Sequence, residues 1–262
     1  MPNTSHLAAA ANAADNLLAL CNARNGWSYR DEDYVIADAG NRGCRVVVTR
    51  PPADATAAIN QLTALAAEHL PGRPIVVEDT FGTMPLEHYG FKPFARVPVM
   101  IRHASASATP GVAGEAPVGK SAALRVIIAK SASEVDDVER LMVDALPLAA
   151  LQPWHHGVLF PADPANIPGW VMWLGLHAEV PIGCCATYDN EHTIGLYGMA
   201  VNSQYRRKGV GRMLLEVILR HYGGRSSCLT STDDGFWLYA SAGYRTVGQA
   251  AWWGLERAQR SG

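Results

Sequence analysis

The run Arg206-Arg207-Lys208-Gly209-Val210-Gly211 places three cationic side chains and two glycines within six residues. Glycine lets the backbone approach a ligand closely, and N–H groups at a helix N-terminus favour anions. This composition predicts a cradle for a phosphate group, with a basic surface turn as the alternative. The loop is not a Walker A sequence, because GxxxxGK(S/T) is absent, and Leu214 stands where GxGxxG needs its third glycine.

The elements beside this loop must be a strand before it and a helix after it if the loop is to bind phosphate. The sequence predicts a strand over 194–201 and an amphipathic helix over about 209–222, whose apolar stripe is Met213, Leu214, Val217 and Ile218. Further strands are expected over 124–129, 170–177, 182–188, 227–232 and 245–253, and further helices over 134–146, capped by Ser133, and 235–242.

Two motifs in this order make the second half of the chain resemble the GCN5-related N-acetyltransferases (GNAT). Val201-(x)4-Arg206-x-x-Gly209-x-Gly211 resembles their acetyl-CoA pyrophosphate motif, Q/R-x-x-G-x-G/A. Leu238-Tyr239-(x)3-Gly243-Tyr244 is similar to their late L-Y-x-x-x-G-F/Y signature. The resemblance covers 124–253, about half of the chain. It implies the α/β GNAT acyl-CoA N-acyltransferase fold, a mixed sheet with helices on both faces.

The resemblance also implies a reaction, in which an amine attacks the thioester of acetyl-CoA, the co-substrate, and expels a thiolate; no metal is implied. The pyrophosphate would bind backbone N–H groups of Arg206, Arg207, Lys208, Gly209, Val210 and Gly211. Met199 and Val201 would pair through their backbones with the pantetheine amides. Tyr239, a phenol with an ordinary pKa of about 10, would protonate the thiolate. Thr232 stands where the family often has a cofactor-binding Asn, which leaves that contact open.

The general base is not identified by these motifs. Glu191 and His192 near the start of the strand 194–201 are candidates, and so are His155 and His156 after the helix 134–146. The alternative is that these four residues are solvated surface residues and that a water chain acts as the base. Trp154 and the histidines beside it are candidates to line an acceptor pocket, against a purely structural role.

The first half of the chain repeats part of the second half. The order strand, helix, strand, short helix, Gly-aromatic turn, strand occurs over 44–50, 54–69, 74–78, 85–89, Gly90-Phe91 and 96–102. It follows a helix over about 7–22 and a stretch that looks irregular. Prolines at Pro51-Pro52 replace the N–H donors of the loop, and Leu86 stands where Tyr239 stands in the other copy. We therefore expect a truncated, degenerate copy, kept as a scaffold or as a wall of the substrate site.

The segment 104–123 has linker composition, almost entirely Ala, Ser, Gly, Pro, Thr and Val. The expected domains are accordingly a degenerate GNAT-like domain over 1–103 and a catalytic GNAT domain over 124–262. The five cysteines are odd in number and lack CxxC spacing, which argues against a disulfide framework or a zinc site. Cys184-Cys185 are expected to be small core residues.

Composition excludes several classes of function. A net charge of −2 gives no general attraction to nucleic acid or anionic membranes, and apolar runs such as 146–151 are far shorter than the roughly 20 residues of a membrane span. Residues 1–14 lack a secretory signal, so a cytoplasmic protein is expected. The expected acceptor is a small-molecule amine. Alternatives are a protein or peptide acetyltransferase and a non-catalytic acyl-CoA-binding module, and a homodimer is among the possible assemblies.

Overall fold

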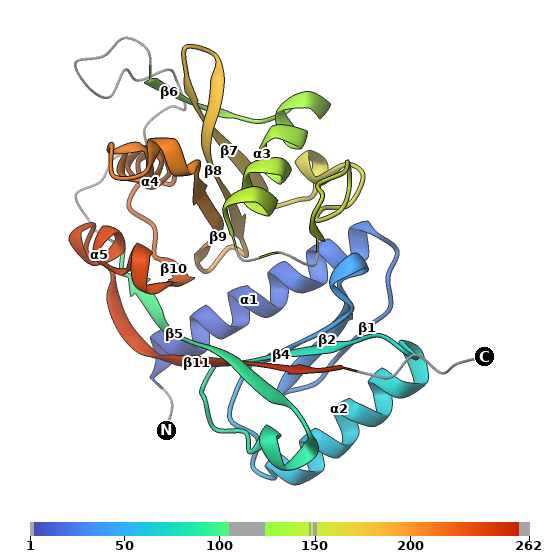
Figure 1. Cartoon of the computed structure of the whole chain (residues 1–262). Helices are drawn as coiled ribbons and strands as arrows, with labels where there is room; N and C mark the ends of the chain where they lie inside the picture. Colours follow the sequence, from blue (N-terminus) through green and yellow to red (C-terminus); the bar gives the residue numbers. More distant parts are fainter. Residues whose placement is uncertain (1–2, 105–123, 147, 149–150, 257–262) are drawn as a thin grey trace. The chain divides into compact units, whose positions relative to one another are not determined.

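The computed structural model describes residues 3–104, 124–146, 148 and 151–256 (Figure 1). All of the expected linker except residue 104 therefore lies outside the described residues. Contacts divide the chain into two compact units, one of Met1–Ile101 with Cys228–Gly262 and one of Arg102–Ser227.

The first unit is built on a mixed sheet in the order β1-β2-β3-β4-β11-β5-β10. Its strands are β1 Ser28–Arg30, β2 Tyr34–Asp38, β3 Cys44–Val48, β4 Ile75–Asp79, β5 Lys92–Arg102, β10 Ser227–Thr230 and β11 Arg245–Leu255. Its helices are α1 Thr4–Ala23, α2 Ala55–His69 and α5 Asp233–Ser241, with 3-10 turns η1 Gly40–Arg42 and η2 Leu86–Tyr89. β3 and β4 are parallel, whereas β11 is antiparallel to both of its neighbours.

Helices α1 and α2 cover opposite faces of this sheet. Neighbouring residues of a strand point to opposite sides of a sheet, so their packing partners show which helix lies on which face. Val46 packs with Ile59 and Leu62 of α2, whereas Val47 packs with Leu17 of α1. The Asp54 side chain caps α2 by accepting a hydrogen bond from the Ala57 N–H, as the sequence predicts.

The last strand, β11, lies between β4 and β5, both of which come from the first half of the chain. Its Trp253 is 6% exposed and belongs to the core beneath α2. This pairing explains why the contact units differ from the expected domains 1–103 and 124–262. The expected domains divide the chain between its two sequence repeats, whereas the contact units divide it by packing. The end of the second repeat completes the sheet of the first.

The second unit holds an antiparallel sheet in the order β9-β8-β7-β6. Its strands are β6 Leu124–Ile128, β7 Trp170–His177, β8 Val180–Asp189 and β9 Ile194–Val201. Its helices are α3 Ala132–Ala145 and α4 Val210–His221, with 3-10 turns η4 Pro164–Asn166 and η5 Ser203–Tyr205. They pack on opposite faces, because Gly183 of β8 contacts α4 while its neighbour Cys184 hydrogen-bonds α3. The predicted mixed α/β class with helices on both faces is confirmed.

Two local expectations were wrong. The stretch before residue 44 is not irregular, since it contains β1 and β2, so the first copy is less truncated than expected. Helix α3 is capped by Ser131 instead of Ser133, because Ser131 and Glu134 form a reciprocal capping box that starts the helix earlier.

Candidate functional site

Strand β9 contains a bulge just before its end. Its register with β8 shifts between the pairs Cys184–Ala200 and Ala186–Tyr197, and Gly198 adopts a φ of +60°. Met142 of α3 packs directly on this glycine, since a Cβ there would lie 2.6 Å from the Met142 Sδ. A bulge interrupts the ladder and redirects the backbone, so the strand end around Met199 departs from regular pairing with β8.

The bulge gives a test of the contact with α3. Gly198→Ala is expected to destabilise the protein by about 1–3 kcal/mol, because it adds positive-φ strain and a clash with Met142. Chemical denaturation of Gly198→Ala, Met142→Ala and the double variant measures the coupling. The clash predicts that Met142→Ala recovers part of the loss; strictly additive effects would show that only the backbone conformation matters.

Arg206, the first residue of the predicted cradle, serves mainly to hold the loop. Its Nε donates to the Val201 carbonyl and its Nη2 to the Ala145 carbonyl at the end of α3, both at 3.1 Å. Its backbone N–H donates to the Ser203 carbonyl at 3.4 Å. The Arg206 side chain therefore joins the end of β9 to the end of α3.

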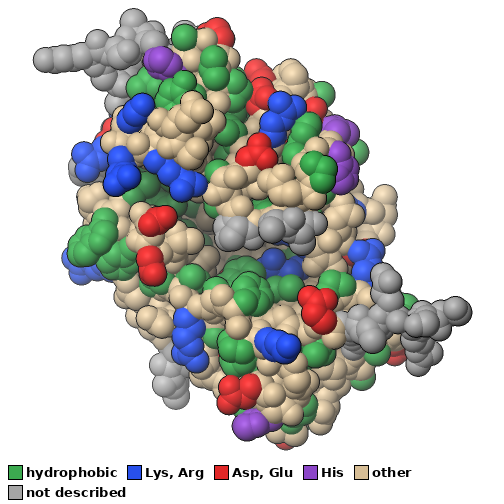
Figure 2. Space-filling model, in the orientation of Figure 1, with side chains coloured by type: hydrophobic (Ala, Val, Ile, Leu, Met, Phe, Trp, Pro, Cys, Tyr) green, Lys and Arg blue, Asp and Glu red, His purple; other side chains and the backbone are tan. Residues whose placement is uncertain are grey.

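Residues 207–209 of the loop are exposed and lead directly into α4. Arg207 has a φ of +60°, and Gly209, the N-cap residue, has a φ of +87° and open space around its Cβ position. The N–H groups of Val210, Gly211 and Arg212 have no acceptor within the helix, as in any first turn. Figure 2 shows lysine and arginine side chains gathered over α4, and the exposed cations of the loop and of this helix are Arg206, Arg207, Lys208, Arg212 and Arg220.

These features fit a polyanionic group such as a pyrophosphate. First-turn N–H groups favour anions, the exposed cations add positive charge, and the glycine leaves room for the ligand. Met199 and Val201 lie on the strand that enters the loop, so the structure brings them together with Arg206–Gly211 in one unit.

Tyr239 and Thr232 lie on α5, which belongs by its contacts to the first unit. Tyr239 is 8% exposed, and its ring meets the Tyr244 ring edge-on at 5.7 Å. Thr232 is the exposed N-cap residue of α5, and its side chain makes no capping hydrogen bond to this described helix.

Glu191 and His192 lie at the far end of β9 from the loop. They occupy the exposed turn between β8 and β9, where Glu191 has a φ of +71°. An eight-residue strand separates this turn from Val201, a distance of about 25 Å. The structure therefore does not bring these two candidate bases together with the cradle.

His155 and His156 are exposed on the segment that follows α3. The His156 Nδ1 lies 2.6 Å from Asp136 Oδ1, and this carboxylate raises the pKa of the imidazole. The same segment is held by Glu139, which sequence reasoning missed. A charged residue of an amphipathic helix usually faces solvent, but Glu139 follows the core residue Val138 and is 2% exposed.

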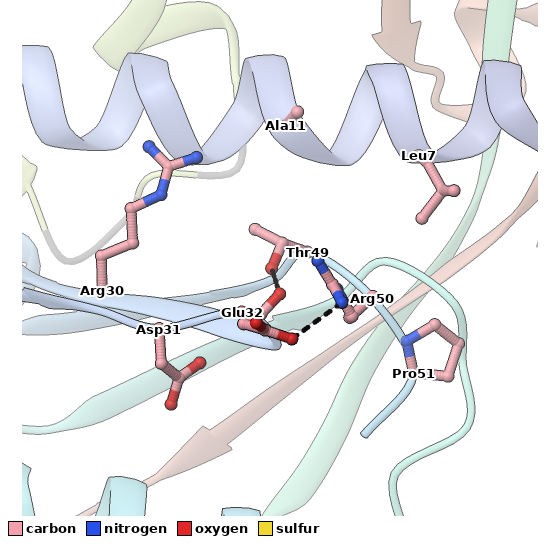
Figure 3. Close-up of a pocket in the computed structure, with 8 residues that line it drawn as sticks. All are labelled: Leu7, Ala11, Arg30, Asp31, Glu32, Thr49, Arg50 and Pro51. Carbon is pink, nitrogen blue, oxygen red and sulfur yellow. Dashed lines mark hydrogen bonds and ion pairs between the residues drawn. The ribbon is translucent and has the colours of Figure 1, made fainter. Parts of the chain in front are cut away.

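A pocket of about 640 Å³ lies at the end of β3, the strand that corresponds to β9 in the first copy (Figure 3). It is lined by Leu7, Ala11, Arg30, Asp31, Glu32, Thr49, Arg50 and Pro51. Arg50 pairs with Glu32 at 3.1 Å, and Arg30 pairs with Asp15 at 2.7 Å. The helix after this strand, α2, has its N-terminus capped by a carboxylate of its own chain. This copy thus lacks the open anion cradle of the second.

Cys184 and Cys185 are fully buried in β8. Burial raises the pKa of both thiols, that of Cys185 to about 12, so neither is suited to act as a thiolate nucleophile. Among the described residues, no three His, Cys, Asp or Glu side chains are grouped as metal ligands. None of the described helices combines the length and apolar character of a membrane crossing.

Comparison with known proteins agrees with this geometry. Residues 168–246, from the start of β7 into β11, match the family model of the acetyltransferase (GNAT) domain. No curated protein matches the chain. The fold is similar to a GCN5-related N-acetyltransferase from Kribbella flavida, with a TM-score of 0.63 at 17% identity over 97% of each chain.

Two further solved structures share the fold over most of their length. A conserved protein of unknown function from Staphylococcus epidermidis has a TM-score of 0.62 at 12% identity, covering 89% of this chain and 95% of its own. A tandem GNAT protein from the clavulanic acid biosynthesis pathway has a TM-score of 0.55 at 15% identity, covering 85% of this chain and 78% of its own.

The bulged strand, the exposed cationic residues and the helix that follows form one continuous feature of the α/β fold whose chemistry suits an anion. With the family match, the resemblance noted in the sequence is confirmed. Residues 168–246 match the acetyltransferase (GNAT) domain of that superfamily, and a solved GCN5-related N-acetyltransferase shares the fold of nearly the whole chain.

Proposed function

We propose that the chain is an acetyl-CoA-dependent N-acetyltransferase of the cytoplasm that acts on a primary amine of a small molecule. The observation that carries the proposal is the loop Arg207–Gly211, which presents first-turn N–H groups and the exposed cations Arg207 and Lys208 inside the family match at 168–246. Acetyl-CoA bound there would supply the activated acetyl group.

Each residue of the site has its own part in this proposal. Arg207, Lys208, Gly209, Val210 and Gly211 hold the pyrophosphate, while Arg206 fixes the loop to β9 and α3. The backbone of Met199 and Val201 aligns the pantetheine arm, and the Thr232 contact stays open. Tyr239 donates a proton to the departing sulfur. Glu191 and His192 are separated from the loop by the length of β9, and His155, His156 and a water chain are the other candidates for the base.

The direct test combines binding and turnover. Calorimetry is expected to give one acetyl-CoA site per chain, because the first copy lacks the open cradle. CoA release is then measured with a panel of L-lysine, spermidine, kanamycin and a tetrapeptide with a free N-terminus. Turnover of a small amine supports the proposal, and turnover of the tetrapeptide alone supports peptide acetylation. Binding without turnover of any panel amine supports an acyl-CoA-binding module.

Tyr239→Phe tests the proposed general acid. The variant keeps the ring, which packs on Tyr244, and removes only the proton donor. We expect kcat to fall about 100-fold while the Kd for acetyl-CoA stays unchanged. The neighbouring Tyr244→Phe is the matched control and should retain activity. An unchanged rate in single-turnover kinetics would contradict the role of Tyr239, because product release is then removed from the measurement.

A further inference from the structure

Glu139 of α3 is a buried carboxylate that organises the segment 154–160. Its Oε1 accepts hydrogen bonds from the N–H groups of Leu159 at 2.7 Å and Phe160 at 2.8 Å. Its Oε2 accepts from the Gly157 N–H at 3.0 Å and the Trp154 Nε1 at 2.9 Å. Four donors thus replace water around one charge, and all four come from this segment.

Other contacts between α3 and residues 152–156 fall on the same face of the helix. Asp136 binds His156 at 2.6 Å, and the Arg140 guanidinium lies 4.3 Å from the centroid of the Trp154 ring. The carbonyl of Val143 accepts a hydrogen bond from the Gln152 side chain at 3.0 Å. Positions 136, 139, 140 and 143 follow the i, i+3, i+4, i+7 spacing of one helix face.

The opposite face of α3 is fixed to the strands and the cradle. The Val138 carbonyl accepts from the Cys184 thiol, Met142 packs on the bulge at Gly198, and the Ala145 carbonyl accepts from Arg206. Positions 138, 142 and 145 again share one helix face. One rigid helix therefore holds the bulge and loop of the cofactor site on one side and the segment 154–160 on the other.

We propose that Glu139 is a positioning residue for the amine acceptor, because it holds the segment 154–160 in a fixed conformation at a set distance from the cofactor strand. This inference rests on the proposed function. Glu139 and Met142 are three residues apart, about 4.5 Å along the helix axis, so the ordered segment and the bulge are held at the same level of α3, on its two faces. The exposed side chains that the segment presents are the imidazoles of His155 and His156.

A carboxylate suits this role better than a neutral side chain. It accepts hydrogen bonds at both oxygens, whereas an amide of the same size would direct an NH₂ group at two of the four donors. A segment ordered before the substrate arrives spares the cost of ordering it on binding. The contribution of Glu139 should therefore appear in the interaction with the amine and not in the interaction with acetyl-CoA.

The test compares Glu139→Gln with Glu134→Gln in the full chain. Glu134 is a carboxylate of the same helix that accepts two N–H groups, those of Lys130 and Ser131, and binds nothing in the segment 154–160. Hydrogen exchange is followed at the amides of Gly157, Leu159 and Phe160. Kinetics use the panel amine with the highest wild-type kcat/KM, and calorimetry gives the Kd for acetyl-CoA.

Glu139→Gln is expected to speed exchange at the three amides and to raise KM for the amine about 10- to 100-fold, with an unchanged Kd for acetyl-CoA. Glu134→Gln should leave all three quantities near wild type. Wild-type exchange in Glu139→Gln, or faster exchange with an unchanged KM, would overturn the inference. Parallel loss of acetyl-CoA binding would also overturn it, by showing that Glu139 supports the whole unit. A wild type that turns over no panel amine contradicts the proposed function instead, and the exchange experiment still decides whether Glu139 orders the segment.

Discussion

A Gly211→Glu variant is expected to lose acetyl-CoA binding while remaining folded. Gly211 is the second residue of α4 and is half-buried in its first turn. A glutamate in a first turn interacts favourably with the helix dipole, so the helix itself should not be destabilised. The same carboxylate would occupy the place proposed for the pyrophosphate, with the same sign of charge. Like charges brought together cost several kcal/mol, which corresponds to an affinity loss of at least about 100-fold.

Calorimetry of three variants separates charge from bulk at this position. Gly211→Ala adds one methyl group, and Gly211→Gln adds a neutral side chain of the size of glutamate. We expect the affinity for acetyl-CoA to fall in the order Ala, Gln, Glu, with equal thermal unfolding curves for Gln and Glu. Normal binding by the Glu variant would show that the first turn of α4 is not the pyrophosphate site.

The loop could be predicted from the sequence because its signals are local. Two glycines, a cluster of cations and an apolar stripe mark the end of a strand and the start of a helix within a few residues, and the structure has Val201 and Val210 at these boundaries. The bulge at Gly198 was not predicted, although an isolated glycine within a strand is the usual sign of one.

Features that depend on contacts distant in sequence were not predictable in this way. β2 is buried on both faces, so it lacks the alternation that marks a strand, and three acidic residues, 31–33, join it to β1. Glu139 has the sequence setting of a solvated helix residue, and only the folded chain shows the four donors around it. The place of β11 between two strands of the first half has no local signal at all.

The position of β11 leads to the largest expected effect of any change to the chain. A truncated chain that begins at Ser121 keeps β6 to β11 but loses β4 and β5, the two neighbours of β11. Trp253 would leave the core beneath α2, a loss of about 4–6 kcal/mol for this side chain alone. Because whole domains are stable by only about 5–15 kcal/mol, we expect this chain to lack cooperative unfolding and to aggregate through its open strand edges.

Supplying the missing strands should reverse this defect. When residues 1–103 are co-expressed as a separate chain with 121–262, β4 and β5 are again available to pair with β11, so a soluble one-to-one complex should form. Size-exclusion chromatography and thermal unfolding followed by circular dichroism measure both results. If 121–262 alone is monomeric and unfolds as cooperatively as the full chain, β11 does not need the first half. If the complex forms and regains acetyl-CoA binding, the first half is a structural part of the enzyme, since its strands enclose the last strand of the second repeat.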